Sequence, residues 1–138
     1  MNTVDYSKMF AHLHKQSNLF FAERFKDLGI SAGQFPYLLV VCDNPGLTQD
    51  EIAAKTRTDK STVAKMVGQL EKTGFLRRKE NPDDGRSRCV FPTARGLETY
   101  PAIAKEKEAW HALLLENFTE TEKLVLDILL QKLNIEPV

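Results

Sequence analysis

The most informative stretch of the chain is residues 47–96, which reads LTQDEIAAKTRTDKSTVAKMVGQLEKTGFLRRKENPDDGRSRCVFPTARG. Thr48 and Glu51 have the spacing of a capping box, which predicts the start of a short helix over about 49–55. After the polar break at 56–58, the pattern predicts a second helix over 59–73, with Thr58 as its N-cap and Gly74 just past its end. Two helices joined by so few residues indicate a helix-turn-helix.

The residues after Gly74 predict a β-hairpin. Residues 75–80 and 88–91 are short candidate strands, and the segment between them is rich in turn-forming Asn, Pro, Asp and Gly. Arg86 then lies near the tip of the hairpin. A hairpin that directly follows a helix-turn-helix is a wing.

The flanking segments predict longer helices. Apolar residues recur three or four apart from Tyr6 to Leu28, and Gly29 follows them. Ser31 is the expected N-cap of a helix that reaches about residue 41. A long helix begins after Thr93, where Pro101 should bend it or mark its true start, and a capping box at 119–122 opens the last helix. The fold class is therefore mainly α with a small β-wing, in one domain over 1–138.

Charge is segregated along the chain although the net charge is zero. Residues 55–95 carry a net charge of +6, and the rest of the chain carries −6. A basic middle between acidic ends is expected if one face meets a polyanion, although chance clustering on a solvated surface produces the same pattern.

The predicted second helix and the wing provide side chains suited to DNA. If Val63, Val67 and Leu70 face the core, the polar residues of this helix project the other way, and Lys, Gln and hydroxyl side chains bond base edges and phosphates. A helix N-terminus can hold a phosphate, an arginine at a hairpin tip can enter a minor groove, and Asp84 can orient such an arginine. The alternative is an ordinary polar surface. The candidate DNA-binding residues are Thr48, Thr58, Lys60, Ser61, Thr62, Lys65, Gln69, Asp84, Arg86 and Arg88.

The same residues resemble the winged-helix core of MarR-type transcriptional regulators. The resemblance is carried by residues 47–53, 59–63 and 70–76, by the wing over 81–86 and by the helix start at 93–96. It implies a winged helix-turn-helix lobe over 31–96, with dimerisation helices over 1–30 and 97–138.

The resemblance also implies a homodimer that binds a pseudo-palindromic operator on double-stranded DNA, as a repressor. Two recognition helices should then lie about one DNA turn apart, roughly 34 Å. Apolar stripes on the long helices agree with a missing partner, although some of these side chains could belong to the core of a single chain. The candidate interface residues are Val4, Met9, Trp110, Leu114, Phe118, Leu124, Ile128 and Leu133.

A further implication of the resemblance is release from DNA by a small aromatic or lipophilic anion. Aromatic side chains and a histidine could line its site, with the alternative that the aromatics are core and the histidine is solvated. The candidates are Phe10, His14, Phe21, Phe35 and Tyr37. No cofactor is expected, and no metal site either, because His12 and His14 are two residues apart and point to different sides of a helix.

Other functions have weaker support. The chain has no nucleophile elbow, zinc-protease, P-loop or dinucleotide motif, so it is not expected to be an enzyme. A winged helix can also serve as a protein-interaction module, and Cys42 or Cys89 could make the regulator redox-sensing. With neither a secretory signal nor a segment of about 20 apolar residues, a cytoplasmic protein without a membrane partner is expected.

Overall fold

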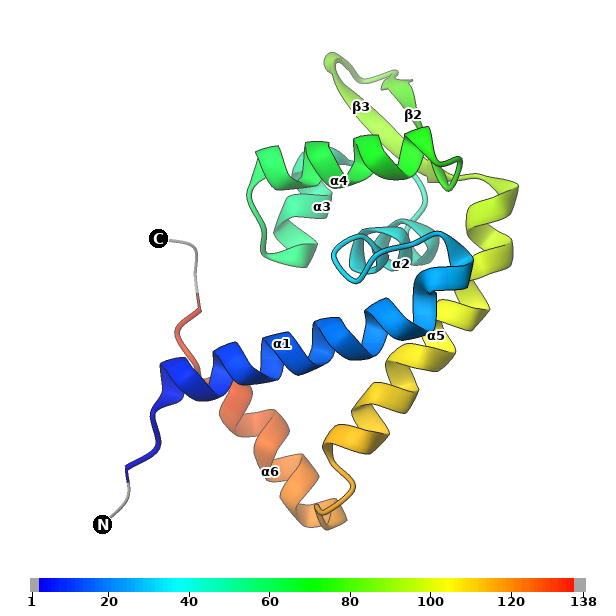
Figure 1. Ribbon diagram of the computed structural model, residues 1–138. Coiled ribbons are helices and arrows are strands. Elements are labelled where there is room, and N and C mark those ends of the chain that lie inside the picture. The colour runs from blue at the N-terminus through cyan, green and yellow to red at the C-terminus, as the bar shows by residue number, and fades with distance from the viewer. Residues whose placement is uncertain (1–2, 136–138) are drawn as a thin grey trace.

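The computed structural model describes residues 3–135 and is mainly helical, with a small antiparallel sheet (Figure 1). The elements follow in the order α1 (Tyr6–Phe25), a short 3-10 helix η1 (Lys26–Leu28), α2 (Phe35–Asp43), β1 (Leu47–Thr48), α3 (Gln49–Thr56), α4 (Lys60–Lys72), β2 (Leu76–Asn81), β3 (Asp84–Pro92), α5 (Ala94–Leu114) and α6 (Glu120–Gln131). The predicted fold class is confirmed.

The sheet places the hairpin next to the helix-turn-helix. Strand order is β1-β3-β2, and β3 pairs antiparallel with both neighbours. Val90 lies opposite Leu47 of β1 and Arg78 of β2, so the hairpin is joined to the start of α3. The sequence did not predict β1, because two residues are too few to show an alternating pattern.

Most predicted helix ends are confirmed. Thr48 and Thr119 each form a complete capping box, and the Thr93 hydroxyl accepts a hydrogen bond from the amide of Gly96. Gly29 and Gly74 both have a positive φ, at 76° and 85°, which reverses the chain where a helix ends. Pro101 lies inside α5, which continues past it.

Two predicted N-caps are wrong. α2 begins at Phe35, four residues after Ser31, because the Ser31 carbonyl accepts bonds from Gln34 and Phe35 in a turn before the helix. α4 is capped by Asp59 instead of Thr58. The Thr58 hydroxyl is engaged elsewhere, since it accepts a bond from the Tyr37 hydroxyl and lies 2.7 Å from the Thr56 hydroxyl.

The core lies under the helix-turn-helix and is closed by α1, α2 and α5. Val63, Val67 and Leu70 are fully buried, as predicted. Every buried apolar residue of the described chain falls between Phe21 and Ile103. The core therefore uses the second half of α1 and the first half of α5, and the outer halves of these helices extend beyond it.

The start of α5 is fixed to the residues that end α4. The Thr93 amide donates to the Phe75 carbonyl at 3.1 Å, and the Thr93 hydroxyl donates to the Gly74 carbonyl at 2.6 Å. The Arg95 guanidinium donates to the Thr73 carbonyl and lies 4.2 Å above the Phe75 ring. A Cβ on Gly96 would lie only 2.4 Å from the Phe75 carbonyl oxygen, so the two backbones are in direct contact.

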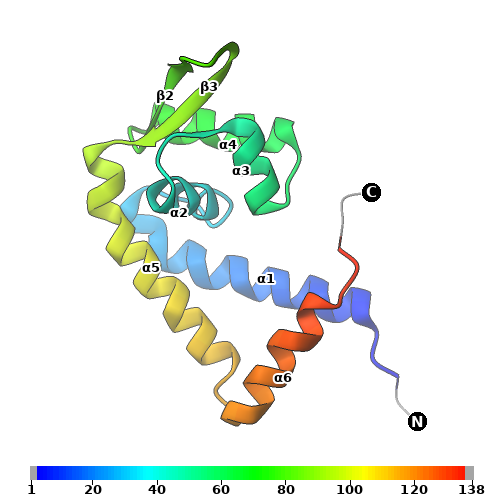
Figure 2. The same ribbon diagram turned by 180° about the vertical axis from the view of Figure 1, so that it is seen from behind.

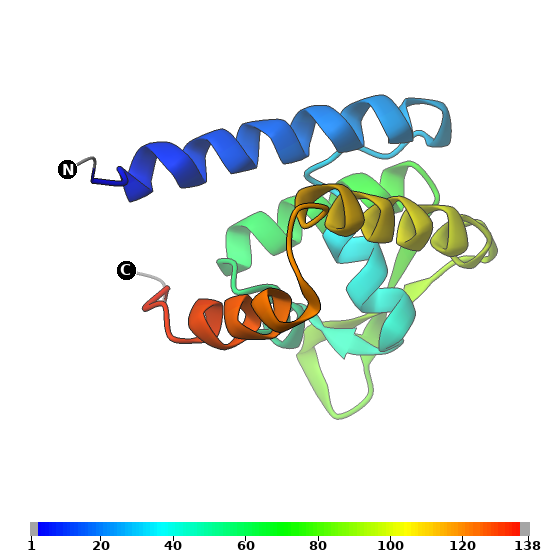
Figure 3. The ribbon, with the colours of Figure 1, turned by 90° about the horizontal axis from the view of Figure 1, so that it is seen from below.

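The long helices α1, α5 and α6 form the end of the molecule opposite the wing (Figure 1). α5 descends from the hairpin past α2 and α1, and α6 turns back toward α1 (Figure 2). Seen from below, the start of α1 and the end of α6 lie on the same side of the molecule (Figure 3). No residue of α6 is buried within the chain as the structure describes it.

Candidate nucleic-acid interface

The first turn of α4 is organised by Asp59. Its Oδ1 accepts the Thr62 amide at 2.7 Å and the Ser61 hydroxyl at 2.6 Å, and its Oδ2 accepts the Thr62 hydroxyl at 2.8 Å. These bonds, with that of the Ser61 hydroxyl as the largest cause, lower the pKa of Asp59 to about 2. A carboxylate therefore occupies the helix end where the sequence suggested a phosphate.

The remaining polar residues of α4 divide between solvent and the protein. Ser61 and Lys65 are exposed. Gln69 is half-buried, and its Oε1 accepts a bond from the Gln34 amide of the segment before α2 at 2.9 Å. Ser61 and Lys65 are thus available to an external partner, whereas the carbonyl of Gln69 is used inside the chain.

Arg86 projects from the tip of the wing. Its side chain is 95% exposed, and its Nε lies 3.6 Å from Asp84 Oδ1, which also accepts the Arg86 amide at 3.0 Å. Asp84 therefore contacts the backbone amide and the Nε of Arg86, but it does not form the expected fork-shaped pair with the guanidinium. Arg88 is exposed on the same strand, and the Asn81 amide donates to the Ser87 hydroxyl at 2.8 Å across the hairpin.

Arg78 joins the wing to both helices of the helix-turn-helix. Its Nη2 and Nε donate to Glu71 Oε1 of α4 at 2.9 and 3.3 Å, and its Nη1 donates to Gln49 Oε1 of α3 at 3.2 Å. The Arg78 hydrogen bond is the largest cause that lowers the pKa of Glu71. In the sequence, Arg78 is recognisable only as one of the positive charges of residues 55–95. Its place two residues after Leu76, on the inward side of β2, was the available signal.

A polar hollow of about 340 Å³ lies where the wing meets α3. Its lining combines three arginines with the start of α3: Gln49, Asp50, Arg78, Arg86, Ser87 and Arg88. Two other candidates are engaged near this hollow, Thr48 before α3 and Lys60 at the start of α4. The Thr48 hydroxyl is used in the α3 capping box, and Lys60 Nζ pairs with Asp50 at 3.3 Å on the exposed surface. The wing and the starts of α3 and α4 thus form one basic, polar face.

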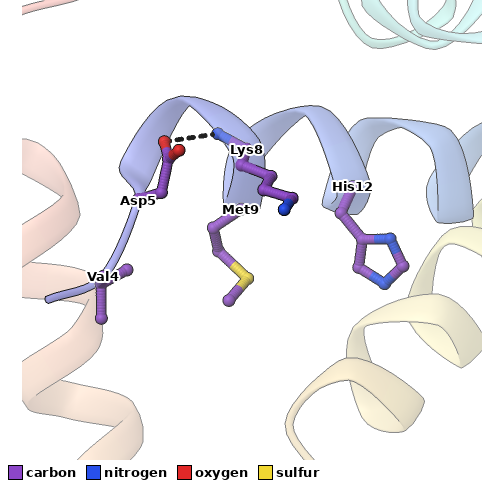
Figure 4. A pocket seen from close by; sticks show the side chains of 5 residues that line it. All are labelled: Val4, Asp5, Lys8, Met9 and His12. Atoms are coloured by element: carbon purple, nitrogen blue, oxygen red, sulfur yellow. Dashed lines mark hydrogen bonds between the residues drawn. The ribbon is translucent and has the colours of Figure 1, made fainter. Parts of the chain in front are cut away.

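Seven of the eight candidate interface residues are exposed apolar side chains on α1, α5 and α6 or beside them. Leu124 and Ile128 are the most exposed, at 65% and 59%. Trp110 differs, because it is half-buried with its ring 5.2 Å from that of Phe20. Figure 4 shows Met9 and His12 on one side of the start of α1, where Val4, Asp5 and Lys8 complete a shallow hollow.

The five candidate effector residues do not meet in one pocket. Phe21 and Phe35 are packed together with their rings 4.4 Å apart, and Tyr37 is only 5% exposed against Thr58. Phe10 lies on an apolar hollow of about 310 Å³ that includes Leu114, Phe118 and residues of α6. His14 is exposed beside Asn18.

A different hollow of about 380 Å³ has the composition expected for an organic anion. Its lining combines apolar side chains with two lysines and one acid: Phe35, Pro36, Leu39, Val40, Asp43, Lys55, Thr56 and Lys107. Of the five candidates, it contains Phe35 alone. Lys55 and Lys107 could not be paired from the sequence because they lie 52 residues apart, on α3 and α5.

Three further observations concern a cysteine, metal ligands and membrane-spanning helices. Cys42 is half-buried, and burial raises the pKa of its thiol to about 11, which favours the unreactive thiol form. Within residues 3–135, no three His, Cys, Asp or Glu side chains gather as metal ligands would. None of the helices in that range is both long and apolar enough to span a bilayer.

Comparison with known proteins relates this fold to transcriptional regulators. Residues 28–87 match the model of the MarR family. The uncharacterized HTH-type transcriptional regulator YybA of Bacillus subtilis is 33% identical over 114 residues, which cover 81% of this chain and 76% of YybA. The HTH-type transcriptional regulator BilQ of Clostridium symbiosum is 31% identical over 115 residues, covering 83% and 80%.

Solved structures agree with this relationship. A MarR protein from Peptoclostridium difficile has a TM-score of 0.89 and 30% identity, over 96% of this chain and 88% of its own. A structure described as a MarR family transcriptional regulator from Listeria monocytogenes, complexed with 26mer DNA, has a TM-score of 0.85 and 30% identity over 96% and 87%.

Proposed function

Because this chain belongs to the MarR family of transcriptional regulators, we propose that it binds double-stranded DNA as a homodimer and represses transcription from a pseudo-palindromic operator. The observation that carries the proposal is the exposure of Arg86 on the wing together with Ser61 and Lys65 on α4. These elements lie at the end of the molecule opposite α6 (Figure 1).

The division of work on this face follows from the chemistry of its side chains. α4 is of a size that a major groove admits, and Ser61 and Lys65 face outward from it toward base edges and phosphates. Arg86 extends into solvent from a narrow hairpin and would enter the adjacent minor groove, whose negative potential attracts a guanidinium. Arg78 bonds the hairpin to α3 and α4, so α4 and the wing keep a fixed spacing.

The homodimer is proposed from the uncovered apolar side chains. Leu124, Ile128 and Leu133 lie exposed on α6 or after it, and Met9 and Leu114 are exposed on α1 and α5. Phe10, Leu114 and Leu130 also line one apolar hollow, and exposed apolar side chains that gather in this way mark an association site. A second copy related by a two-fold axis would cover it and present two winged lobes to the two halves of an operator.

An aromatic or lipophilic anion is proposed as the effector. Support comes from the hollow between α2, α3 and α5, where Phe35 and Leu39 offer apolar contact and Lys55 and Lys107 offer positive charge. A ligand there would touch α3 of the DNA-binding lobe and α5 of the dimerisation region together. Its binding can therefore change how the two lobes are spaced, which is the basis for proposing relief of repression.

The test is selection of bound duplexes from a random pool, followed by titration at several salt concentrations. A DNA-binding dimer should enrich a two-fold symmetric site and lose affinity steeply as salt rises, through counterion release. Arg86→Ala should weaken binding to that site by about 1–3 kcal/mol without changing dimerisation. A protein-interaction module would enrich no duplex, and unchanged affinity of Arg86→Ala would contradict the role of the wing.

A further inference from the structure

We propose that Asp59 restricts which bases the recognition helix can bind: by accepting the hydroxyl protons of Ser61 and Thr62, it leaves Ser61 able only to accept hydrogen bonds and so selects adenine or cytosine, the bases that present an amino group in the major groove. The proposal rests on DNA binding through α4, as proposed above. It concerns base preference, which binding alone does not define.

The geometry of the first turn supports this restriction. An ionised carboxylate is only an acceptor, and a hydroxyl has one proton to donate and two lone pairs. Both hydroxyl protons are directed at Asp59, with donor–acceptor distances of 2.6 Å from Ser61 and 2.8 Å from Thr62. The Thr62 amide completes the set at 2.7 Å, which holds the carboxylate in place.

The restriction should persist in solution. Hydrogen bonds to an ionised acceptor are roughly twice as strong as those between neutral groups. Turning the Ser61 proton outward would exchange such a bond for a weaker one to a base. The pKa of Asp59, at about 2, keeps the acceptor charged at any pH near neutrality.

The major groove presents donors and acceptors in a pattern that a locked hydroxyl can distinguish. Adenine N6 and cytosine N4 carry the amino donors, whereas guanine O6 and N7 and thymine O4 are acceptors. Ser61 is exposed and Thr62 is half-buried, so Ser61 is the hydroxyl placed to meet a base. A lone pair on Ser61 Oγ would accept from adenine or cytosine and would repel an acceptor of guanine or thymine.

The experiment begins with duplexes selected by the wild-type protein. The operator position opposite Ser61 is the one at which Ser61→Ala alters base preference. Adenine or cytosine is expected there, and a base analogue without the amino group should bind roughly three- to tenfold more weakly, the size of one ordinary hydrogen bond. The binding of the base analogue is measured with the unaltered protein, and only the assignment of the position uses Ser61→Ala.

The second measurement uses Asp59→Asn, whose Oδ1 can still accept the Thr62 amide but, being neutral, holds the Ser61 hydroxyl proton less strongly than the carboxylate does. The preference for amino-bearing over keto-bearing bases at this position should fall by a similar factor. Asp5→Asn is the matched control, since Asp5 caps α1 by accepting the Lys8 amide at 3.1 Å. The base preference of this variant should equal that of the wild type.

The failures of the two proposals are distinguishable. If the wild-type protein enriches no duplex, DNA binding and this inference both fall. Enrichment with guanine or thymine opposite Ser61, a uniform loss of affinity in Ser61→Ala, or an unchanged preference in Asp59→Asn would each overturn the inference and leave DNA binding intact.

Discussion

The helix-turn-helix lobe and the outer halves of the long helices differ in how far their apolar side chains are exposed to solvent. In the lobe, Val63, Val67 and Leu70 are completely buried. On α6, Leu124 and Ile128 remain more than half exposed, and all the exposed large apolar side chains of residues 3–135 lie within 4–19 or 97–135. One region buries its apolar side chains within a single chain, whereas the other leaves them exposed.

The largest expected effect comes from placing a charge on the uncovered region. Ile128→Glu should prevent two copies from associating, because an unpaired carboxylate would have to leave water. Loss of the second lobe removes the gain from two linked sites, so affinity for a two-fold operator should fall roughly a hundredfold or more. Sedimentation and duplex titration measure the two effects.

The control for this substitution is Ala102→Glu, which places the same charge on an exposed position of α5 outside the apolar surface. It should remain dimeric. The contrast between the two regions would be contradicted if Ile128→Glu stayed dimeric at low micromolar concentration. Normal thermal unfolding of Ile128→Glu would show that the core of a single chain folds without a partner.

The next largest effect tests the junction between the two regions. Gly96→Ala would place a Cβ 2.4 Å from the Phe75 carbonyl oxygen, a backbone atom that cannot move without shifting β2. Overpacking of this kind costs about 1–3 kcal/mol of unfolding free energy. Denaturant unfolding measures it, and Gly33→Ala, which meets no atom closer than 3.9 Å, should be nearly neutral.

The sequence predicted the local features of the fold and failed where tertiary contacts chose between local options. The capping boxes at 48–51 and 119–122 depend on neighbouring residues and were identified correctly. Thr58 and Asp59 are adjacent and both suit an N-cap. The choice was made by Tyr37 of α2, whose hydroxyl engages Thr58, and no local pattern contains that contact.

The same limit explains what was missed in the candidate site. Ser61, Lys65 and Arg86 were expected to be exposed from helical spacing and turn chemistry, and they are. Gln69 has equally suitable chemistry, but Gln34, 35 residues earlier, engages it. The effector candidates were chosen by residue type, and the fold distributes them over separate places because aromatic type does not encode position.

A smaller effect on stability is expected from a substitution inside the lobe, at Gly68. Gly68 lies inside α4, and a Cβ there would meet only Arg78 Nη2, at an ordinary contact distance of 3.7 Å. Gly68→Ala should therefore raise the unfolding free energy by up to about 1 kcal/mol, from helix propensity. A lower unfolding free energy in chemical denaturation would show that the added methyl group disturbs the hydrogen bonds of Arg78 with Glu71 and Gln49.

The smallest effect concerns pH. The pKa of Asp59 is lowered to about 2 in the folded chain, below the ordinary value of 3.8, so its contribution to stability is present above pH 4. That contribution should disappear as pH falls from about 4 toward 2. The unfolding midpoint of Asp59→Asn should depend less on pH than that of the wild type across this window, and equal slopes would contradict the capping role.

The contacts between the start of α5 and the residues that follow α4 couple the motions of the two helices. Because Thr93 and Arg95 bond the residues that follow α4, and Gly96 touches the Phe75 backbone, α4 must follow any swing of α5. With 21 residues, α5 is roughly 30 Å long, so a rotation of about 6° at its far end carries its near end through an arc of about 3 Å. That arc is about the length of a hydrogen bond, so a small tilt of α5 is enough to shift the polar side chains of α4 by the distance of one contact.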